Sequence, residues 1–154
     1  MRLLILHVDR FAYTVTDAAR SRLREEVAER TYAVEEALLA LASVEQADAA
    51  APAEVAERAA AELAHLARQL GVARIVLHPF AHLFGEPSAP AVAVAVLDAT
   101  KAQLEACGLS VHRSPFGWFT RWDLQAKGHP LSRVARLVRA TPGPASEEDG
   151  RSVP

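Results

Sequence analysis

A long amphipathic segment in the middle of the chain restricts the fold more than any other feature. Its apolar side chains recur every three or four residues and form a single stripe, which indicates a helix over residues 52–70: Val55, Ala59, Leu63, Leu66 and Leu70. Pro52 suits the first turn, where its missing N–H costs nothing, and Gly71 suits the C-cap. A helix with one apolar stripe has to bury that stripe against another element.

Short apolar and β-branched segments before and after this helix predict a sheet. We expect strands over residues 2–8, 11–16, 75–77, 109–111 and 116–124, with the first two paired as a hairpin across residues 8–10. A second helix is expected over residues 91–106 and ends at Gly108. The order of elements predicts an α/β or α+β domain in which two main helices pack on a β-sheet.

Three segments keep two interpretations each. Residues 18–30 are rich in Arg and Glu and indicate an exposed helix or an ordered loop. Residues 34–44 favour a helix by propensity, but a strand over 37–44 also fits. Residues 131–138 fit a strand or a short helix.

Length and composition exclude several classes of protein. The 154 residues correspond to one domain, and 32 of them are Ala, so the core depends on fewer large side chains than the 51% hydrophobic content suggests. The single cysteine, Cys107, excludes a disulfide framework and a Cys-rich zinc site. We expect no transmembrane span, no signal peptide and a cytoplasmic location. The domain is expected over residues 1–140, with a disordered tail or linker over 141–154.

The net charge of −2 hides an uneven distribution. Residues 1–100 carry 9 basic and 14 acidic groups, whereas residues 101–139 carry 7 basic and 2 acidic groups. The basic block also contains four of the nine aromatic residues. Basic side chains that bind phosphates, next to aromatic rings that stack on bases, are typical of a nucleic-acid-binding surface. A strand with a solvated basic face and aromatic side chains in the core gives the same pattern.

The segment from His78 to Phe84 combines histidines with a strand end, where ligands tend to bind in sheets covered by helices. His78 and His82 are four residues apart, but Pro79 opposes the helix that would turn both toward one metal ion. A histidine that acts as a hydrogen-bond partner or general base fits better than a metal ligand. A partly buried histidine at a strand end, without a function, fits equally well. Cys107 follows a helix C-terminus, where the helix dipole does not activate a thiol. We therefore expect no metal site, no cofactor and no covalent nucleophile motif.

Five short segments occur in an order and at a spacing that resemble the N-terminal editing domain of archaeal threonyl-tRNA synthetase. They are Met1 to His7 with Asp9, Ser43-Val44-Glu45, Pro79-Phe80-Ala81-His82-Leu83, Pro115-Phe116-Gly117 and Lys127-Gly128-His129-Pro130-Leu131. The resemblance spans about residues 1–139. It implies the fold of D-aminoacyl-tRNA deacylases, a homodimer, and a strand rather than a helix over residues 37–44.

The resemblance also implies an activity, the hydrolysis of serine wrongly esterified to threonine tRNA. A synthetic site for threonine rejects the smaller serine weakly, because one methyl group contributes only about 1–3 kcal/mol. The implied partner is the aminoacylated 3′ end of tRNA, and a threonyl-tRNA synthetase can act as a separate protein. We expect no membrane association.

The resemblance assigns site residues by position. His82 would orient the substrate or the water, the loop of Pro79, Phe80 and Ala81 would line the amino-acid end, and the adenosine side would be formed by Phe116, Gly117, Trp118 and Phe119. The family has a lysine where this chain has Thr120, and a glutamate where it has Arg133. Arg121 or Lys127 would replace the missing cation.

These two departures leave three hypotheses. The first is a deacylase of mischarged tRNA that uses a positioned water, with catalytic candidates His82, Lys127 and Thr120. The second is a homologue that binds aminoacyl-tRNA or adenosine without turnover. The third is a deacylase for a D-amino acid or a non-protein amino acid on tRNA. Arg133 cannot act as a base at neutral pH, but Arg133 and Arg121 can contact tRNA phosphates.

Overall fold

The computed structural model describes residues 1–83 and 85–141. Its α+β fold contains six strands, two long helices and one short 3₁₀ helix. In chain order these are β1 (Arg2–Ala18), β2 (Thr31–Ser43), η1 (Gln46–Ala50), α1 (Pro52–Leu70), β3 (Arg74–Pro79), α2 (Pro90–Ala106), β4 (Ser110–Arg113), β5 (Trp118–Ala126) and β6 (Arg133–Leu137).

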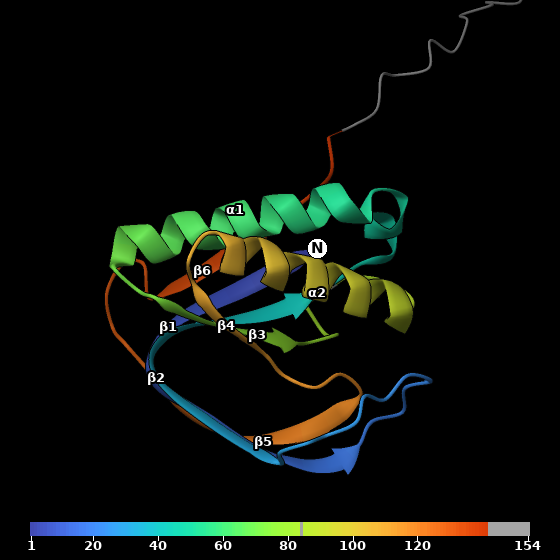
Figure 1. Cartoon of the computed structure of the whole chain (residues 1–154), viewed down its shortest axis with the longest axis horizontal. Coiled ribbons are helices and arrows are strands. Elements are labelled where there is room, and N and C mark those ends of the chain that lie inside the picture. The colour runs from blue at the N-terminus through green and yellow to red at the C-terminus, as the bar shows by residue number, and fades with distance from the viewer. Residues whose placement is uncertain (84, 142–154) are drawn as a thin grey trace, which may run out of the picture.

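One mixed sheet in the order β4-β3-β2-β1-β5 organises the molecule (Figure 1). The pairs β2–β3 and β3–β4 are parallel, whereas β1 is antiparallel to β2, β5 and β6. The long strand β1 has two successive partners on one side, because residues 2–6 pair with β6 and residues 8–18 pair with β5. This change of partner divides the sheet into two halves.

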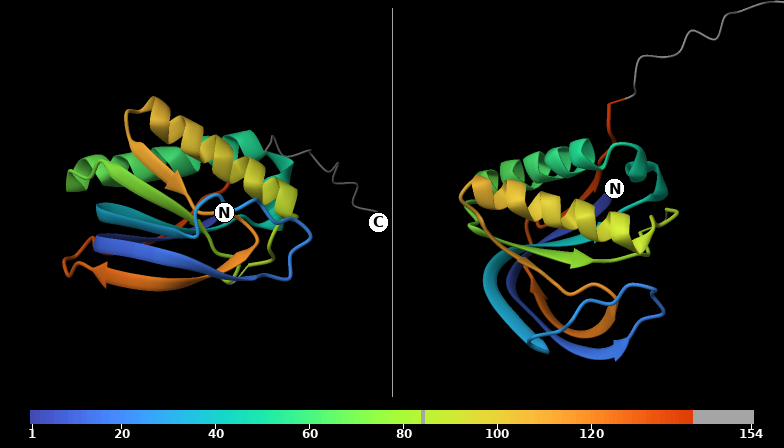
Figure 2. Two further views of the ribbon diagram at one scale, coloured as in Figure 1. Left: turned by 60° about the horizontal axis from the view of Figure 1, so that its bottom comes forward. Right: turned by 45° about the vertical axis from the view of Figure 1, so that its right-hand side comes forward.

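Helices α1 and α2 lie side by side on one face of the first half (Figure 2). The apolar stripe of α1 is buried there with Ile5, Leu38 and Leu97 in one core cluster. Five of the buried residues of α1 are alanines, which let the helix approach its neighbours closely: Ala56, Ala59, Ala60, Ala64 and Ala67. Among the described residues, no helix combines the length and apolar character needed to cross a membrane.

The second half of the sheet curls away from the helices and encloses a separate apolar cluster (Figure 2). The curl begins at Asp9 and Glu36, which lie opposite each other between the paired positions of β1 and β2. Glu36 has a positive φ of 49°, which is unusual for a residue with a side chain. Side chains on the concave face are even-numbered in β1 before this point and odd-numbered after it: Leu6 and Val8, then Phe11 and Tyr13.

Lys127 bridges the two strands at this irregularity. Its ammonium group donates hydrogen bonds to carboxylate oxygens of Asp9 and of Glu36, the latter at 2.9 Å. Its backbone N–H donates to the carbonyl of His7. Without this cation, two carboxylates on neighbouring strands would face each other, which destabilises a sheet.

The structure decides several of the expectations from sequence. The helix over residues 52–70 and the strand over 37–44 are confirmed, residues 19–30 form a loop, and residues 133–137 form a strand. The expected hairpin across residues 8–10 is wrong, because β1 runs without a turn from Arg2 to Ala18. The irregularity at Asp9 bends the strand but does not reverse it. The expected tail falls outside the described residues from 142 onward.

Replacing Lys127 with methionine is expected to lower the thermal midpoint at low salt, because Asp9 and Glu36 then repel each other. The deficit should shrink between about 0.01 M and about 1 M salt, since screening weakens both the attraction and the repulsion. Calorimetry of Lys127→Met beside Lys101→Met, which removes the partly exposed ion pair with Glu105 on one helix, tests this. A deficit that is equal for both variants or independent of salt would contradict it.

Candidate functional site

Strand β5 presents alternating side chains to the inside and to the outside of the curl. Trp118, Thr120 and Trp122 are partly buried on the inner face. Phe119 and Arg121 lie on the outer face, and Phe119 is 59% exposed. Thr120 and Phe119 are neighbours in sequence, but they cannot line the same cavity.

His78 is the centre of a polar group inside the curl. Its Nδ1 lies 2.8 Å from the hydroxyl of Ser114, and its Nε2 lies 3.4 Å from the hydroxyl of Thr120. The Trp122 indole N–H donates to that same Thr120 oxygen at 2.7 Å. Three elements supply these groups, because His78 lies on β3, Ser114 directly follows β4, and Thr120 and Trp122 lie on β5.

Aromatic rings surround His78 and keep it from water. The rings of Phe11, Tyr13 and Trp122 have their centres 5.2–5.8 Å from that of His78, all close to edge-to-face. Burial lowers the pKa of His78 to about 4, so the ring is neutral near pH 7. It therefore acts as a hydrogen-bonding group and carries no charge.

A second histidine closes the curl on the other side. The His112 ring stacks on Tyr32 with the ring centres 3.6 Å apart, and its Nε2 lies 2.8 Å from the Tyr13 hydroxyl. Burial lowers the pKa of His112 to about 4 as well. Tyr13, Tyr32 and His112 line a cavity of about 420 Å³ together with charged residues of the loop and of α2, including Glu29 and Lys101.

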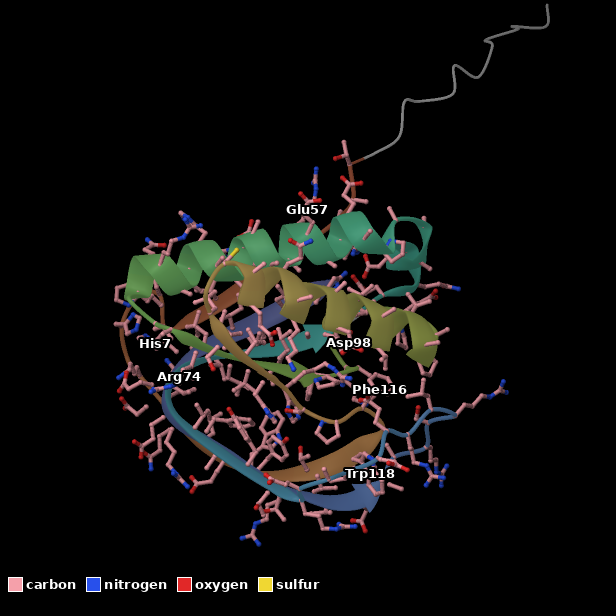
Figure 3. The ribbon with its side chains drawn as sticks, viewed as in Figure 1. His7, Glu57, Arg74, Asp98, Phe116 and Trp118 are labelled. Atoms are coloured by element: carbon pink, nitrogen blue, oxygen red, sulfur yellow. The ribbon has the colours of Figure 1, made fainter. Side chains whose placement is uncertain are left out.

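The loop over residues 19–30 is held against the entrance to β5. Arg113 forms a two-pronged pair with the Glu25 carboxylate, at 2.6 and 2.5 Å, and a further pair with Asp98 of α2. Hydrogen bonds from Arg113 hold the pKa of Glu25 below its usual value. The same carboxylate accepts the Phe116 N–H, and the Glu25 carbonyl accepts the Trp118 indole N–H. Figure 3 shows Asp98, Phe116 and Trp118 on this side of the molecule.

The loop that follows β3 brings its predicted residues to the same region. The Phe80 N–H donates to the Ala42 carbonyl, which fixes the loop to the end of β2. The Phe80 ring lies 6.2 Å from the rings of Trp122 and of His82. Pro79 is partly buried, and Ala81 and His82 are exposed. Phe80 and Thr120 therefore meet through Trp122, with His82 at the outer edge.

Four of the predicted residues lie elsewhere, among them Phe119, which lies on the outer face of β5 and not beside Trp118 on the inner face. Lys127 follows β5 at the irregularity, seven residues from Thr120, which corresponds to about 20 Å along a strand. Arg133 is exposed on β6 and pairs with Leu6 of β1. Arg121 is exposed on the outer face of β5. In the same region as Lys127, His7 and His129 share a hydrogen bond of 2.8 Å. Figure 3 shows His7 far from Trp118.

A second cavity of about 310 Å³ lies between α1 and the end of β6. It is lined by Arg58, Ala61, Glu62, His65, Leu137, Val138 and Arg139. None of the catalytic, substrate-binding or tRNA-binding residues predicted from sequence lines either cavity. Within residues 1–83 and 85–141, no three histidine, cysteine or acidic side chains are placed to hold a metal ion.

Sequence reasoning missed most of the interior group. The sequence does not predict Ser114, Trp122, Tyr13 or His112 as site residues, and it predicts a hydrogen-bonding histidine in the 78–84 segment without separating His78 from His82. The alternation of Trp118, Thr120 and Trp122 was a usable signal for one inner face. No local signal could show that β3, β4 and β5 meet across the curl.

The fold and the interior group define a small α+β domain whose curled sheet encloses aromatic and hydroxyl side chains. Residues 1–138 match the family model described as the archaea-specific editing domain of threonyl-tRNA synthetase. The chain belongs to this family, as the resemblance predicted.

Curated relatives support the assignment. The chain is similar to threonine–tRNA ligases of Thermococcus gammatolerans and Methanopyrus kandleri, at 37% identity over 151 and 149 residues, and of Methanococcoides burtonii, at 38% over 141 residues. These matches cover 96%, 97% and 90% of this chain but only 24%, 24% and 22% of the relatives. The chain thus spans about a quarter of their length.

Gly117 is expected to be indispensable for the packing of the 19–30 loop. Its φ is +90°, and a Cβ atom there would lie 2.5 Å from the Leu23 carbonyl oxygen. Gly117→Ala should lower the free energy of unfolding by roughly 2–3 kcal/mol. Gly128→Ala, where a Cβ atom meets nothing within 4 Å, should change it by less than about 0.5 kcal/mol in the same urea titration. Equal effects would contradict this packing.

Acid is expected to destabilise the fold through the two neutral histidines. Their pKa values near 4 lie below the ordinary 6.5, so the unfolded chain binds protons that the folded chain excludes. Stability is therefore lost as the pH falls from about 6.5 toward 4, by up to roughly 3 kcal/mol for His78 and less for the more exposed His112.

Urea unfolding at several pH values between about 7.5 and 4.5 measures this loss. His78→Gln, which stays neutral, should lose less stability over this range than the parent chain. His65→Gln, a change on the exposed face of α1, should leave the pH dependence unaltered. An unchanged slope in His78→Gln would disprove the assignment.

Proposed function

We propose that this chain hydrolyses seryl-tRNA formed in error on threonine tRNA. Family membership over residues 1–138 is the observation that carries the proposal, and it supports deacylation of mischarged tRNA as the class of reaction. In this reaction the water oxygen bonds to the ester carbon, and the bond from that carbon to the ribose oxygen breaks. The ribose oxygen takes a proton, which leaves free serine and uncharged tRNA.

The interior group beside the loop after β3 is the proposed site. Phe80, Trp122 and Thr120 meet there, and exposed His82 borders it. Neutral rings and hydroxyl groups can position an uncharged ester and a water molecule. Positioning of this kind contributes a large part of the rate in enzymes that lack a strong acid or base.

The proposed preference for serine rests on size. Serine lacks one methyl group relative to threonine, so a site that admits only the smaller side chain corrects an error that a synthetic site makes readily. The partly buried rings of Phe80 and Trp122 would set that size limit.

The proposed partner is the aminoacylated 3′ end of tRNA. Exposed Phe119 and Arg121 share the outer face of β5, where a ring and a cation are available to a base and a phosphate. Exposed Arg133 offers a further phosphate contact. A homodimer, a separate threonyl-tRNA synthetase and a cytoplasmic location belong to the same proposal.

Deacylation assays with a panel of L- and D-aminoacyl-tRNAs test the function. Threonine tRNA that carries serine should lose its ester at least about tenfold faster with the protein than without it. Threonyl-tRNA should lose its ester more slowly than this seryl-tRNA. His82→Ala should slow the reaction by roughly 10- to 100-fold, because His82 borders the site. His65→Ala should leave the rate unchanged.

The other outcomes separate the remaining hypotheses. Turnover confined to a D- or non-protein aminoacyl ester would replace the serine proposal with another deacylase activity. Binding of a non-hydrolysable seryl-adenosine analogue without turnover of any ester would indicate a binding module. The departures at Thr120 and Arg133 favour this last alternative over an unrelated function.

A further inference from the structure

The Thr120 hydroxyl has a restricted set of hydrogen bonds. Its oxygen accepts the Trp122 indole N–H, which is a donor only, so one lone pair is occupied. One proton and one further lone pair remain. His78 Nε2 takes one of them, and the other is left for a ligand, because Thr120 is only partly buried. The tautomer of His78 therefore decides whether Thr120 offers a donor or an acceptor to a ligand.

A chain of buried groups fixes that tautomer. Ser114 lies 2.8 Å from His78 Nδ1 and forms a hydrogen bond with Tyr13, whose hydroxyl lies 2.8 Å from His112 Nε2. Burial raises the pKa of Tyr13, and a hydrogen bond from Ser114 opposes this rise. Ser114 is 0% exposed and His78 is 5% exposed, so bulk water does not compete for the hydrogen bond between them.

The direction follows from the strongest donor. A phenol is far more acidic than the N–H of a neutral imidazole, so the Tyr13 O–H donates to His112 Nε2. Ser114 then donates to the Tyr13 oxygen, and His78 donates its Nδ1–H to Ser114. His78 Nε2 is thereby left without a proton and accepts the Thr120 O–H.

We propose that Thr120 is the residue that orients the attacking water, through its remaining lone pair, with His78 as the positioning residue that takes the Thr120 proton. This inference rests on the proposed deacylase function and names the group that holds its water. A water O–H donates to the Thr120 oxygen, which directs a water lone pair at the ester carbon. Thr120 and His78 form no covalent bond to the substrate.

The tautomer can be measured without any assay of activity. The ¹⁵N shifts of the His78 ring in the intact chain should show a protonated Nδ1 and a bare Nε2, with His78→Gln used for assignment. A protonated Nε2 would overturn the proposal, because Thr120 would then present its proton. This result holds whether or not the chain hydrolyses seryl-tRNA, so it separates this inference from the proposed function.

Kinetics test the consequence for turnover of seryl-tRNA. Thr120→Val should lower kcat by roughly 10- to 100-fold with KM changed less than about threefold, whereas Thr120→Ser should keep most of the activity. His78→Phe should cause a similar loss, and the double variant should be no slower than Thr120→Val, because the two residues act as one unit. Additive losses of kcat in the double variant, or a rise in KM with kcat unchanged, would contradict the proposal.

Thr14→Val provides the matched control. Thr14 is exposed on the outer face of β1, opposite Arg121 in the strand register, and the change removes the same hydroxyl from the same sheet. It should leave kcat unchanged. Thermal midpoints of all variants identify any loss due to unfolding, and a kcat loss in Thr14→Val equal to that in Thr120→Val would reject the role of Thr120.

Discussion

The ion pairs of Lys127 with Asp9 and Glu36 hold the point on which the rest of the structure depends. At this point β1 changes its partner from β6 to β5, and the inward-facing side chains of β1 change from even to odd positions. A regular strand would keep one phase throughout and would extend the sheet without this change of face. The irregularity creates a concave half with its own aromatic lining, and the lysine neutralises the two carboxylates that the bend brings together.

This arrangement gives the Lys-Gly-His-Pro-Leu segment a structural meaning. Lys127 holds the bend, and His129 bonds His7 on the first part of β1. Both contacts are made in the first half of β1, away from the part of β1 that pairs with Thr120. The segment therefore supports the shape of the curl from a distance. The lysine that was a catalytic candidate from sequence thus occupies a position suited to architecture, about 20 Å along the strand from the interior group.

The sequence predicts the helical half of the molecule better than the curled half. The stripe of α1 and the bounds set by Pro52 and Gly71 are local signals, and the structure reproduces them. The prediction of a hairpin is wrong because a bulge and a turn give the same sequence pattern where charged residues separate two apolar segments. The pairing of His78 with Ser114 depends on parallel strands separated by a helix in sequence, and no local pattern encodes such a contact. The opposite faces of Thr120 and Phe119 follow from the period of two in a strand, once β5 is known to be one.

The separation of the sheet into two halves also affects how such a domain changes over evolutionary time. The helices stabilise the first half through side chains that do not reach the concave interior, and the interior group contributes little to that core. Substitutions among His78, Ser114 and Thr120 therefore alter hydrogen-bonding chemistry without changing a side chain of the helical core. The hydrogen-bonding chemistry of the concave interior and the packing of the helical core can then change through separate substitutions.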